Sequence, residues 1–466
     1  MSKTIGEKLS EELSYKRKNA AEILSEKEIT IAFDFAAGYK EFIKRAKTER
    51  EFVELALEKA EKNGFKKFEY GKKYKSGDKI VYNNRNKALI MAVIGKENIK
   101  NGVNIVASHI DAPRIDLKPN PLYEDGFMAF FKTHYYGGIK KYQWPTVPLA
   151  LHGVVIKKDL SAVNVCIGED INDPVFYITD LLPHLASEQV TKPLGTAISA
   201  ESLNVLVSSF PIVDEKATDK IKLNALKLLN EKYGIVEDDF LSAELSLVPA
   251  LDPRDVGLDR SLIGAYAHDD RVCSYPAMEA ILSETAPEKT GICVLADKEE
   301  IGSSGNTGLD TNFLYDFICE LSESLGANKR EVLSNSSCLS ADVNVCFDPN
   351  FPEVYEKRNT AFINHGVVLT KYTGARGKSG TSDASAEFTA KIRALLEENN
   401  ICWQTGELGK VDMGGGGTVA QYIAKLNIDV IDIGVAVLSM HAPYEVISKL
   451  DLYNMYLASK CFFESK

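Results

Sequence analysis

The chain has 466 residues, of which 45% are hydrophobic and 26% are charged. This composition is ordinary for a soluble globular protein and excludes a disordered, collagen-like or coiled-coil chain. The net charge of −11 argues against nucleic acid as a partner, because binding to phosphates needs a basic surface. At about 150 residues per domain, we expect two or three domains.

The N-terminal segment and the cysteines indicate where the protein resides. The first residues, MSKTIGEKLSEELSYKRK, contain no apolar core of the kind found in secretory signals. No run approaches the ~18 apolar residues that a membrane-spanning helix needs, so we expect no membrane contact. The eight cysteines are scattered without a CxxC pair, which is typical of reduced packing residues. We therefore expect a cytoplasmic location.

The N-terminal region has a helical pattern. Apolar residues recur at helical spacing between residues 49 and 62. Thr48, with Glu51 three residues later, has the spacing of a capping box. Asn63-Gly64 is a common way for a helix to end. The pattern predicts a helix that begins just after Thr48 and ends at these two residues.

The next two apolar runs predict strands. Residues 87–95 and 103–109 are short, apolar and bounded by Gly, Asn and Lys. Near-continuous apolarity indicates strands that are covered on both faces, as in the sheet of an α/β protein. We therefore predict an α/β fold with a mixed or parallel sheet.

The composition changes between residues 118 and 250. This stretch contains the aromatic and glycine pairs of Tyr135-Tyr136-Gly137-Gly138 and several short β-like runs. An α/β rhythm returns at about residue 251. We predict an inserted, β-rich domain over residues 118–250. The flanking segments, 1–117 and 251–466, would then form one discontinuous α/β domain.

Polar side chains follow the predicted strands of that domain. After the insert, the β-like runs 291–300, 338–342 and 430–441 each end in acidic or imidazole groups. A further run of acids, Asp269-Asp270, precedes an amphipathic stretch over residues 272–283. Because ligands gather at the carboxyl ends of strands in an open α/β sheet, we expect a site there.

The imidazole and carboxylate groups at these strand ends form a metal-binding pattern. In chain order they are His109, Asp269, Glu299, Glu300, Asp342 and His441. Such ligands suit zinc, with cobalt and manganese as competitors. If only one of the two adjacent glutamates is a ligand, five ligands remain. Five ligands are too many for one tetrahedral zinc that keeps an open position, but they suffice for two metals if one carboxylate bridges them. One of the two adjacent glutamates would then be free to act as a general base toward a metal-activated water.

These motifs match a known family. The segments His109-Ile-Asp111-Ala-Pro-Arg, Asp269-Asp270, Asp297-Lys-Glu299-Glu300-Ile-Gly302, Ser340-Ala-Asp342 and Met440-His441 resemble those of the aspartyl aminopeptidase and vacuolar aminopeptidase I family. Two segments of the insert, Tyr136-Gly137-Gly138 and Pro183-His184-Leu185-Ala186, also resemble family segments. The resemblance covers nearly the whole chain.

The resemblance implies a fold, an activity and a ligand set. The fold would be that of a di-zinc exopeptidase with an inserted β-rich domain, and the activity would be removal of the N-terminal amino acid from peptides. Asp269 would bridge two zinc ions. His109 and Asp342 would complete one site, and Glu300 and His441 would complete the other.

The resemblance also implies two catalytic roles and an assembly. Glu299 would be the general base, and Asp111 would orient His109 through its second ring nitrogen. Members of the family assemble as dodecamers through their insert domains, so we expect a homo-oligomer of this kind.

The sequence departs from the family pattern at two places. The family usually has Asn after the bridging aspartate, whereas this chain has Asp270. We expect this change to be tolerated, because the bridging role belongs to the first residue. The segment 140–145 is more divergent, and if it contacts the active site of a neighbouring subunit it affects substrate preference.

Candidate substrate-binding residues lie outside the metal ligands. The basic cluster Lys371, Arg376 and Lys378 would contact an acidic substrate side chain, or else it forms a solvated turn. Gly415, within a run of four glycines, would let the backbone approach the peptide. His184, in the family segment of the insert, is a further candidate. If none of the three basic side chains faces the metals, we expect a preference for neutral N-terminal residues.

Two alternative functions remain open from the sequence. A deacylase or carboxypeptidase would use the same metal scaffold, although the segments of the insert argue against it. A non-catalytic assembly or cargo shell would have kept the fold but lost a base or a ligand. All six positions are filled here, which favours an enzyme.

Overall fold

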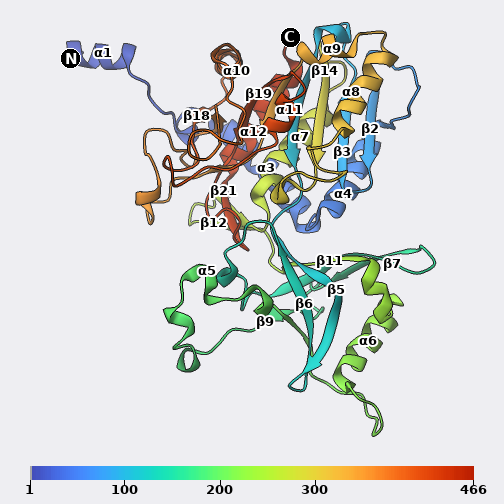
Figure 1. The fold of residues 1–466 in the computed structure, drawn as a ribbon. Helices are drawn as coiled ribbons and strands as arrows, with labels where there is room; N and C mark the ends of the chain where they lie inside the picture. The colour runs from blue at the N-terminus through green and yellow to red at the C-terminus, as the bar shows by residue number, and fades with distance from the viewer. Residues whose placement is uncertain (1–2) are drawn as a thin grey trace.

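The computed structural model describes residues 3–466. Figure 1 shows two bodies, one above the other, each with its own sheet. The chain leaves the first body after β4 and returns to it before β14. The short helix α1 (Ile5–Leu13) projects away from both bodies and contains no buried residue.

The first body is built on a mixed sheet of nine strands. In spatial order these are β1 (Lys66–Lys67), β2 (Lys79–Asn84), β3 (Ala88–Val93), β14 (Thr290–Ala296), β4 (Val103–His109), β15 (Ser337–Ala341), β19 (Asp429–Gly434), β17 (Val367–Thr370) and β18 (Trp403–Thr405). The four central strands, β14, β4, β15 and β19, are mutually parallel. The predicted α/β fold with a mixed sheet is therefore confirmed.

Helices cover both faces of this sheet. Successive residues of a strand point to opposite faces, so Cys293 and Leu295 join one hydrophobic cluster and Ile292 and Val294 join the other. The helices of the first cluster are α3 (Glu26–Arg45), α4 (Glu49–Lys62), α7 (His268–Ser283), α10 (Ala386–Glu398) and α12 (Lys449–Glu464). Those of the second are α8 (Phe313–Ser324), α9 (Lys329–Ser334) and α11 (Ala420–Ala424). Burial on both faces explains the continuous apolar runs of the central strands.

The second body contains an antiparallel sheet of seven strands. In spatial order these are β8 (Ala162–Ile167), β7 (Leu149–Ile156), β11 (Ala243–Pro249), β5 (Arg114–Asp125), β6 (Met128–Tyr136), β10 (Val205–Ser208) and β9 (Tyr177–Ile178). The helix α6 (Lys220–Tyr233) packs on this sheet, and Trp144 and Phe131 are fully buried in its core. Strand β5 begins before the predicted boundary at residue 118.

A small third sheet links distant parts of the first body. It consists of β12 (Arg254–Val256), β13 (Leu262–Ala265) and β21 (Glu445–Ser448). Strand β13 leads into α7, and β21 follows the loop that contains His441. Pairing of Ala265 with Glu445 therefore brings the start of α7 beside that loop.

The predicted helix after Thr48 is confirmed. It is α4, and Thr48 and Glu51 form the expected capping box. Two other local predictions were wrong. The stretch 272–283 was expected to be amphipathic, but α7 is packed between the sheet and other helices and is buried on nearly all sides. The run 430–441 was expected to be one strand, but β19 ends at Gly434, and a two-residue strand β20 (Ala436–Val437) follows.

No helix within residues 3–466 has the length and apolar character needed to cross a membrane. The eight cysteines are all free, and six of them are buried.

Candidate metal centre

The predicted metal ligands converge beside one cavity of about 350 Å³, which all of them line except the buried His109. His109 is the last residue of β4, and Asp342 directly follows β15. Glu299 and Glu300 lie in a 3₁₀ turn after β14. These three strands are parallel neighbours, so their carboxyl ends meet at one edge of the sheet.

Asp269 lies between two imidazoles. Its Oδ1 atom is 3.2 Å from Nε2 of His109, and its Oδ2 atom is 3.1 Å from Nε2 of His441. The carboxylate therefore presents one oxygen to each histidine. This is the arrangement that a carboxylate shared by two cations would have.

The remaining acids surround the same two histidines. Asp342 Oδ1 is 3.7 Å from Nε2 of His109, and Glu300 Oε2 is 3.6 Å from Nε2 of His441. Glu299 Oε2 is 4.0 Å from Nε2 of His109. Potential ligand atoms of His109, Asp269 and Glu300 all lie within 4.8 Å of one another.

Asp270 is also close to this group. Ligand atoms of His109, Asp270 and Asp342 lie within 4.8 Å of one another. Asp270 is fully buried, and its Oδ2 atom accepts a long hydrogen bond of 3.4 Å from the backbone amide of His109. The residue that departs from the family pattern thus lies beside the predicted ligands.

The electrostatics of the site suit cations. Burial, together with the Asp342 and Asp111 carboxylates, raises the pKa of Glu299 to about 8. Burial also raises the pKa of Asp342 and of Glu300, whose Oε1 atom is buried and has no hydrogen-bond partner within residues 3–466. Imidazole and carboxylate donors packed this closely fit zinc, because a dication offsets the mutual repulsion of the carboxylates.

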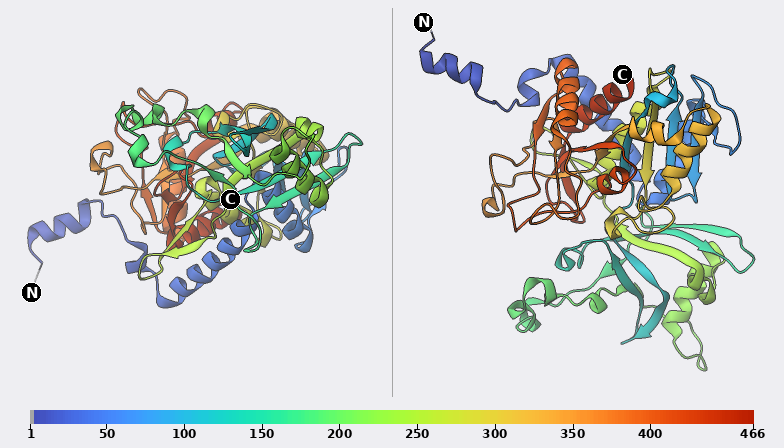
Figure 2. Two further views of the ribbon diagram at one scale, coloured as in Figure 1. Left: turned by 90° about the horizontal axis from the view of Figure 1, so that it is seen from below. Right: turned by 45° about the horizontal axis from the view of Figure 1, so that its top comes forward.

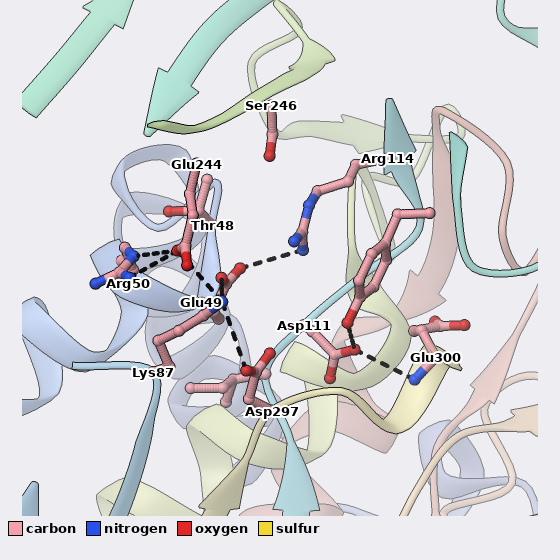
Figure 3. Close-up of polar contacts among 12 residues, drawn as sticks. Thr48, Glu49, Arg50, Lys87, Asp111, Arg114, Glu244, Ser246, Asp297 and Glu300 are labelled. Carbon is pink, nitrogen blue, oxygen red and sulfur yellow. Dashed lines mark hydrogen bonds and ion pairs between the residues drawn. The ribbon is translucent and has the colours of Figure 1, made fainter. Parts of the chain in front are cut away.

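Asp111 holds the turn that contains the two glutamates. Its side chain accepts a hydrogen bond from the backbone amide of Glu299 at 3.1 Å. It accepts a second from the backbone amide of Glu300 at 3.2 Å (Figure 3). Its backbone carbonyl lies 3.1 Å from Nδ1 of His109, and its Oδ1 atom lies 3.4 Å from the same nitrogen. Asp111 therefore contacts the ring nitrogen of His109 that faces away from Asp269.

Two groups at the site were missed from the sequence. The carbonyl of Gly138 accepts a hydrogen bond of 2.7 Å from Nδ1 of His441. Glu445 is buried, and its carboxylate accepts hydrogen bonds from the backbone amides of His441 and Asp269. A backbone carbonyl leaves no mark in a sequence. The only available indication for Glu445 was its place four residues after His441.

The predicted substrate-binding residues are spread over three places. Gly415 lines the cavity, where a Cβ atom would lie 2.4 Å from Cα of Ala375. Glycine is therefore needed for packing of the loops around the cavity. His184 is exposed on the second body and does not line the cavity.

The basic cluster lies outside the cavity lining. Lys371, Arg376 and Lys378 are exposed. The ammonium group of Lys378 lies 3.0 Å from the Asp383 carboxylate, and that of Lys371 lies 3.8 Å from it. In this chain the cluster therefore does not face the metal ligands.

Comparison with known proteins identifies the family. The family model described as aminopeptidase I zinc metalloprotease (M18) matches residues 42–463. The chain belongs to this family. Across 444 residues the aminopeptidase is 50% identical to the probable M18 family aminopeptidase 1 of Clostridium acetobutylicum, a match that covers 94% of this chain and 96% of that protein.

Solved structures agree with this assignment. The M18 aminopeptidase of Thermotoga maritima is 43% identical, with a TM-score of 0.93 over 97% of this chain and 100% of that one. The mApe1 dodecamer of S. cerevisiae is 24% identical, with a TM-score of 0.75 over 92% of this chain and 96% of that one. The latter likeness shows the shared fold alone. The chain is a zinc metalloaminopeptidase, as predicted, and the comparisons favour this function over the deacylase, carboxypeptidase and shell alternatives.

Proposed function

We propose that the aminopeptidase binds two zinc ions and shares Asp269 between them. The observation that carries this proposal is the position of the Asp269 carboxylate, with one oxygen near His109 and the other near His441. Asp342 would complete the site of His109, and Glu300 would complete the site of His441. Cobalt or manganese would be possible substitutes.

Glu299 is the proton carrier in this proposal. When bound, the zinc ions would supply Lewis-acid polarisation of the scissile carbonyl and would lower the pKa of a water molecule. Glu299 lines the cavity without being needed as a ligand. The charge of bound zinc ions would lower its raised pKa, so that its carboxylate takes the proton of the attacking water and passes it to the leaving amine. Asp111 keeps Glu299 in place through the hydrogen bond to its backbone amide.

The lining of the cavity supports a neutral N-terminal residue as substrate. Beyond the acids it offers Val343, Leu408, Met440 and Thr373, and neither lysine nor arginine lines it in the described chain. An acidic substrate side chain would be left without a cationic partner, which is costly in a partly desolvated pocket. Peptides that begin with a neutral residue therefore fit best.

The proposal also covers the oligomeric state of the protein and its location in the cell. We infer a homo-oligomer, with a dodecamer as the form that the S. cerevisiae mApe1 structure suggests. Residues 118–250 would make the subunit contacts. His184 is exposed outside the cavity of its own chain, so a role in substrate binding would require a second subunit. A cytoplasmic location is supported by the eight free cysteines.

Substrate panels and metal analysis test the proposal together. We expect the purified protein to cleave amino-acid anilides, to leave N-acylated amino acids intact, and to contain two zinc ions per chain by elemental analysis. Full activity with a single zinc ion per chain would overturn the shared role of Asp269. Cleavage of N-acylated amino acids in preference to anilides would favour the deacylase alternative.

A further inference from the structure

A short segment of the second body reaches the metal centre of the first. Strand β6 of the seven-stranded sheet ends at Tyr136, and Gly137 and Gly138 follow it. A Cβ atom on Gly137 would lie 3.3 Å from Cβ of Glu300, and one on Gly138 would lie 3.4 Å from Nδ1 of His441. The backbone of this segment thus lies directly against two predicted ligands.

The first contact of the segment is made by a side chain. The hydroxyl of Tyr136 donates a hydrogen bond of 2.8 Å to Oδ2 of Asp111. The same oxygen accepts the backbone amide of Glu300, and the other oxygen accepts that of Glu299. Tyr136 therefore fixes the Asp111 carboxylate. This carboxylate in turn holds the 3₁₀ turn of Glu299 and Glu300 and contacts Nδ1 of His109.

The second contact is made by the backbone. The carbonyl of Gly138 accepts a hydrogen bond of 2.7 Å from Nδ1 of His441. This contact places the hydrogen on Nδ1 and leaves Nε2, which faces Asp269, free to bind a metal. One three-residue segment thus supports both histidines, one of them through Asp111 and the other directly.

Tyr136 is itself held by a buried ion-pair network. The guanidinium of Arg114 lies 4.0 Å from the centre of the Tyr136 ring. Arg114 is fixed in turn by Asp116 at 2.8 Å. It is also fixed by Glu49 of α4 at 3.2 Å, and Lys87 lies 3.3 Å from Glu49 (Figure 3). Because α4 and Lys87 belong to the first body, the ring is clamped between the two bodies.

We propose that Tyr136 and the Gly138 carbonyl are positioning groups, through which the second body orients both metal-binding histidines. The inference rests on the proposed ligand roles of His109 and His441. It assigns to the inserted sheet a part in the metal centre of its own subunit, in addition to the proposed part in assembly. Partners that orient a ligand in this way change metal affinity or activity roughly 10–100-fold when they are removed.

The test is Tyr136→Phe, which removes one hydroxyl and keeps the ring beside Arg114. We expect kcat to fall roughly 10–100-fold, KM for an amino-acid anilide to stay within about twofold, and zinc to be lost at lower chelator concentrations than in the wild type. The matched control is Tyr135→Phe, since Tyr135 is 38% exposed and its ring stacks on His134. This variant should retain wild-type kcat and zinc affinity.

A second variant tests the backbone contact. Gly137→Ala strains the segment, because Gly137 has a φ of +74° and a Cβ atom there would lie 3.3 Å from Cβ of Glu300. We expect it to shift the Gly138 carbonyl and to weaken the binding of one zinc ion while the other stays bound. Wild-type kcat and wild-type zinc retention in both Tyr136→Phe and Gly137→Ala would overturn the inference. If the wild-type protein itself neither binds zinc nor cleaves anilides, the proposed function fails instead, so the two failures are distinguishable.

Discussion

His152 joins the two bodies of the aminopeptidase, and its replacement should destabilise the protein strongly. The residue lies on β7 and is 2% exposed. Its Nδ1 atom donates to Glu51 of α4 at 2.7 Å, and its Nε2 atom donates to Glu169 at 2.9 Å. Burial alone would lower the pKa of His152. Its hydrogen bonds, to Cys166 and to the two carboxylates, raise the pKa to about 11 instead.

The size of the effect follows from these contacts. A rise of the pKa from 6.5 to about 11 corresponds to roughly 6 kcal/mol, at about 1.4 kcal/mol per pH unit. The side chains of Glu51 and Glu169 remain 25% and 20% exposed, so water screens part of this interaction. We therefore expect His152→Gln to lower the free energy of unfolding at pH 7 by about 3 kcal/mol, the lower end for breaking a buried ion pair.

The pH dependence gives a second measure of the same contact. Because the folded-state pKa is raised, the stabilisation is fully present below about pH 6.5 and is lost as the pH rises toward 11. Urea unfolding of wild type and His152→Gln should show a difference that shrinks across this range. His134→Gln is the control, since His134 is an exposed histidine of the same sheet. A difference below about 0.5 kcal/mol at pH 7, or one that does not change with pH, would refute the reasoning.

Three further predictions concern the metal centre. Glu299→Gln should lower kcat by a factor on the order of 10²–10⁴ with unchanged zinc content, and near wild-type turnover would rule Glu299 out as the proton carrier. Asp269→Ala should lose zinc from both sites, so elemental analysis that finds two ions per chain would contradict the shared role. Leu-terminal substrates should have a higher kcat/KM than Asp-terminal ones, and Lys371→Ala, Arg376→Ala and Lys378→Ala should leave this ratio unchanged. A strong preference for Asp-terminal substrates would contradict this prediction. If that preference survived all three substitutions, the cation that selects the acidic residue would lie outside this basic cluster.

The sequence predicted those parts of the site that depend on strand ends. His109 and Asp342 end adjacent parallel strands, so a run of apolar residues followed by a ligand was enough to place both at one edge. The capping box at Thr48 was likewise predictable, because it depends on residues close in sequence.

Other parts depend on contacts between distant segments. The burial of nearly the whole of α7 results from packing against both the sheet and α12, which no local pattern records. Glycine is needed at position 434, where β19 ends, because a Cβ atom there would collide with the backbone carbonyl of Asp342 on another segment. Glu445 accepts hydrogen bonds from the backbone amides of His441 and Asp269, and Gly138 acts through its own backbone carbonyl, so neither residue type marks the role.

The order of strands in the large sheet constrains how the chain can fold during synthesis. Strand β14 lies between β3 and β4, although both of these leave the ribosome before it. Neither β3 nor β4 can pair with β14 until the whole antiparallel sheet and its connections have been made. That sheet is contiguous in the chain and needs no later strand, so we expect it to fold first. Strand β3 can meanwhile pair with β2, but the apolar strand β4 has no partner until β14 and β15 have been made, so we expect β4 to be the strand of the nascent chain most exposed to aggregation.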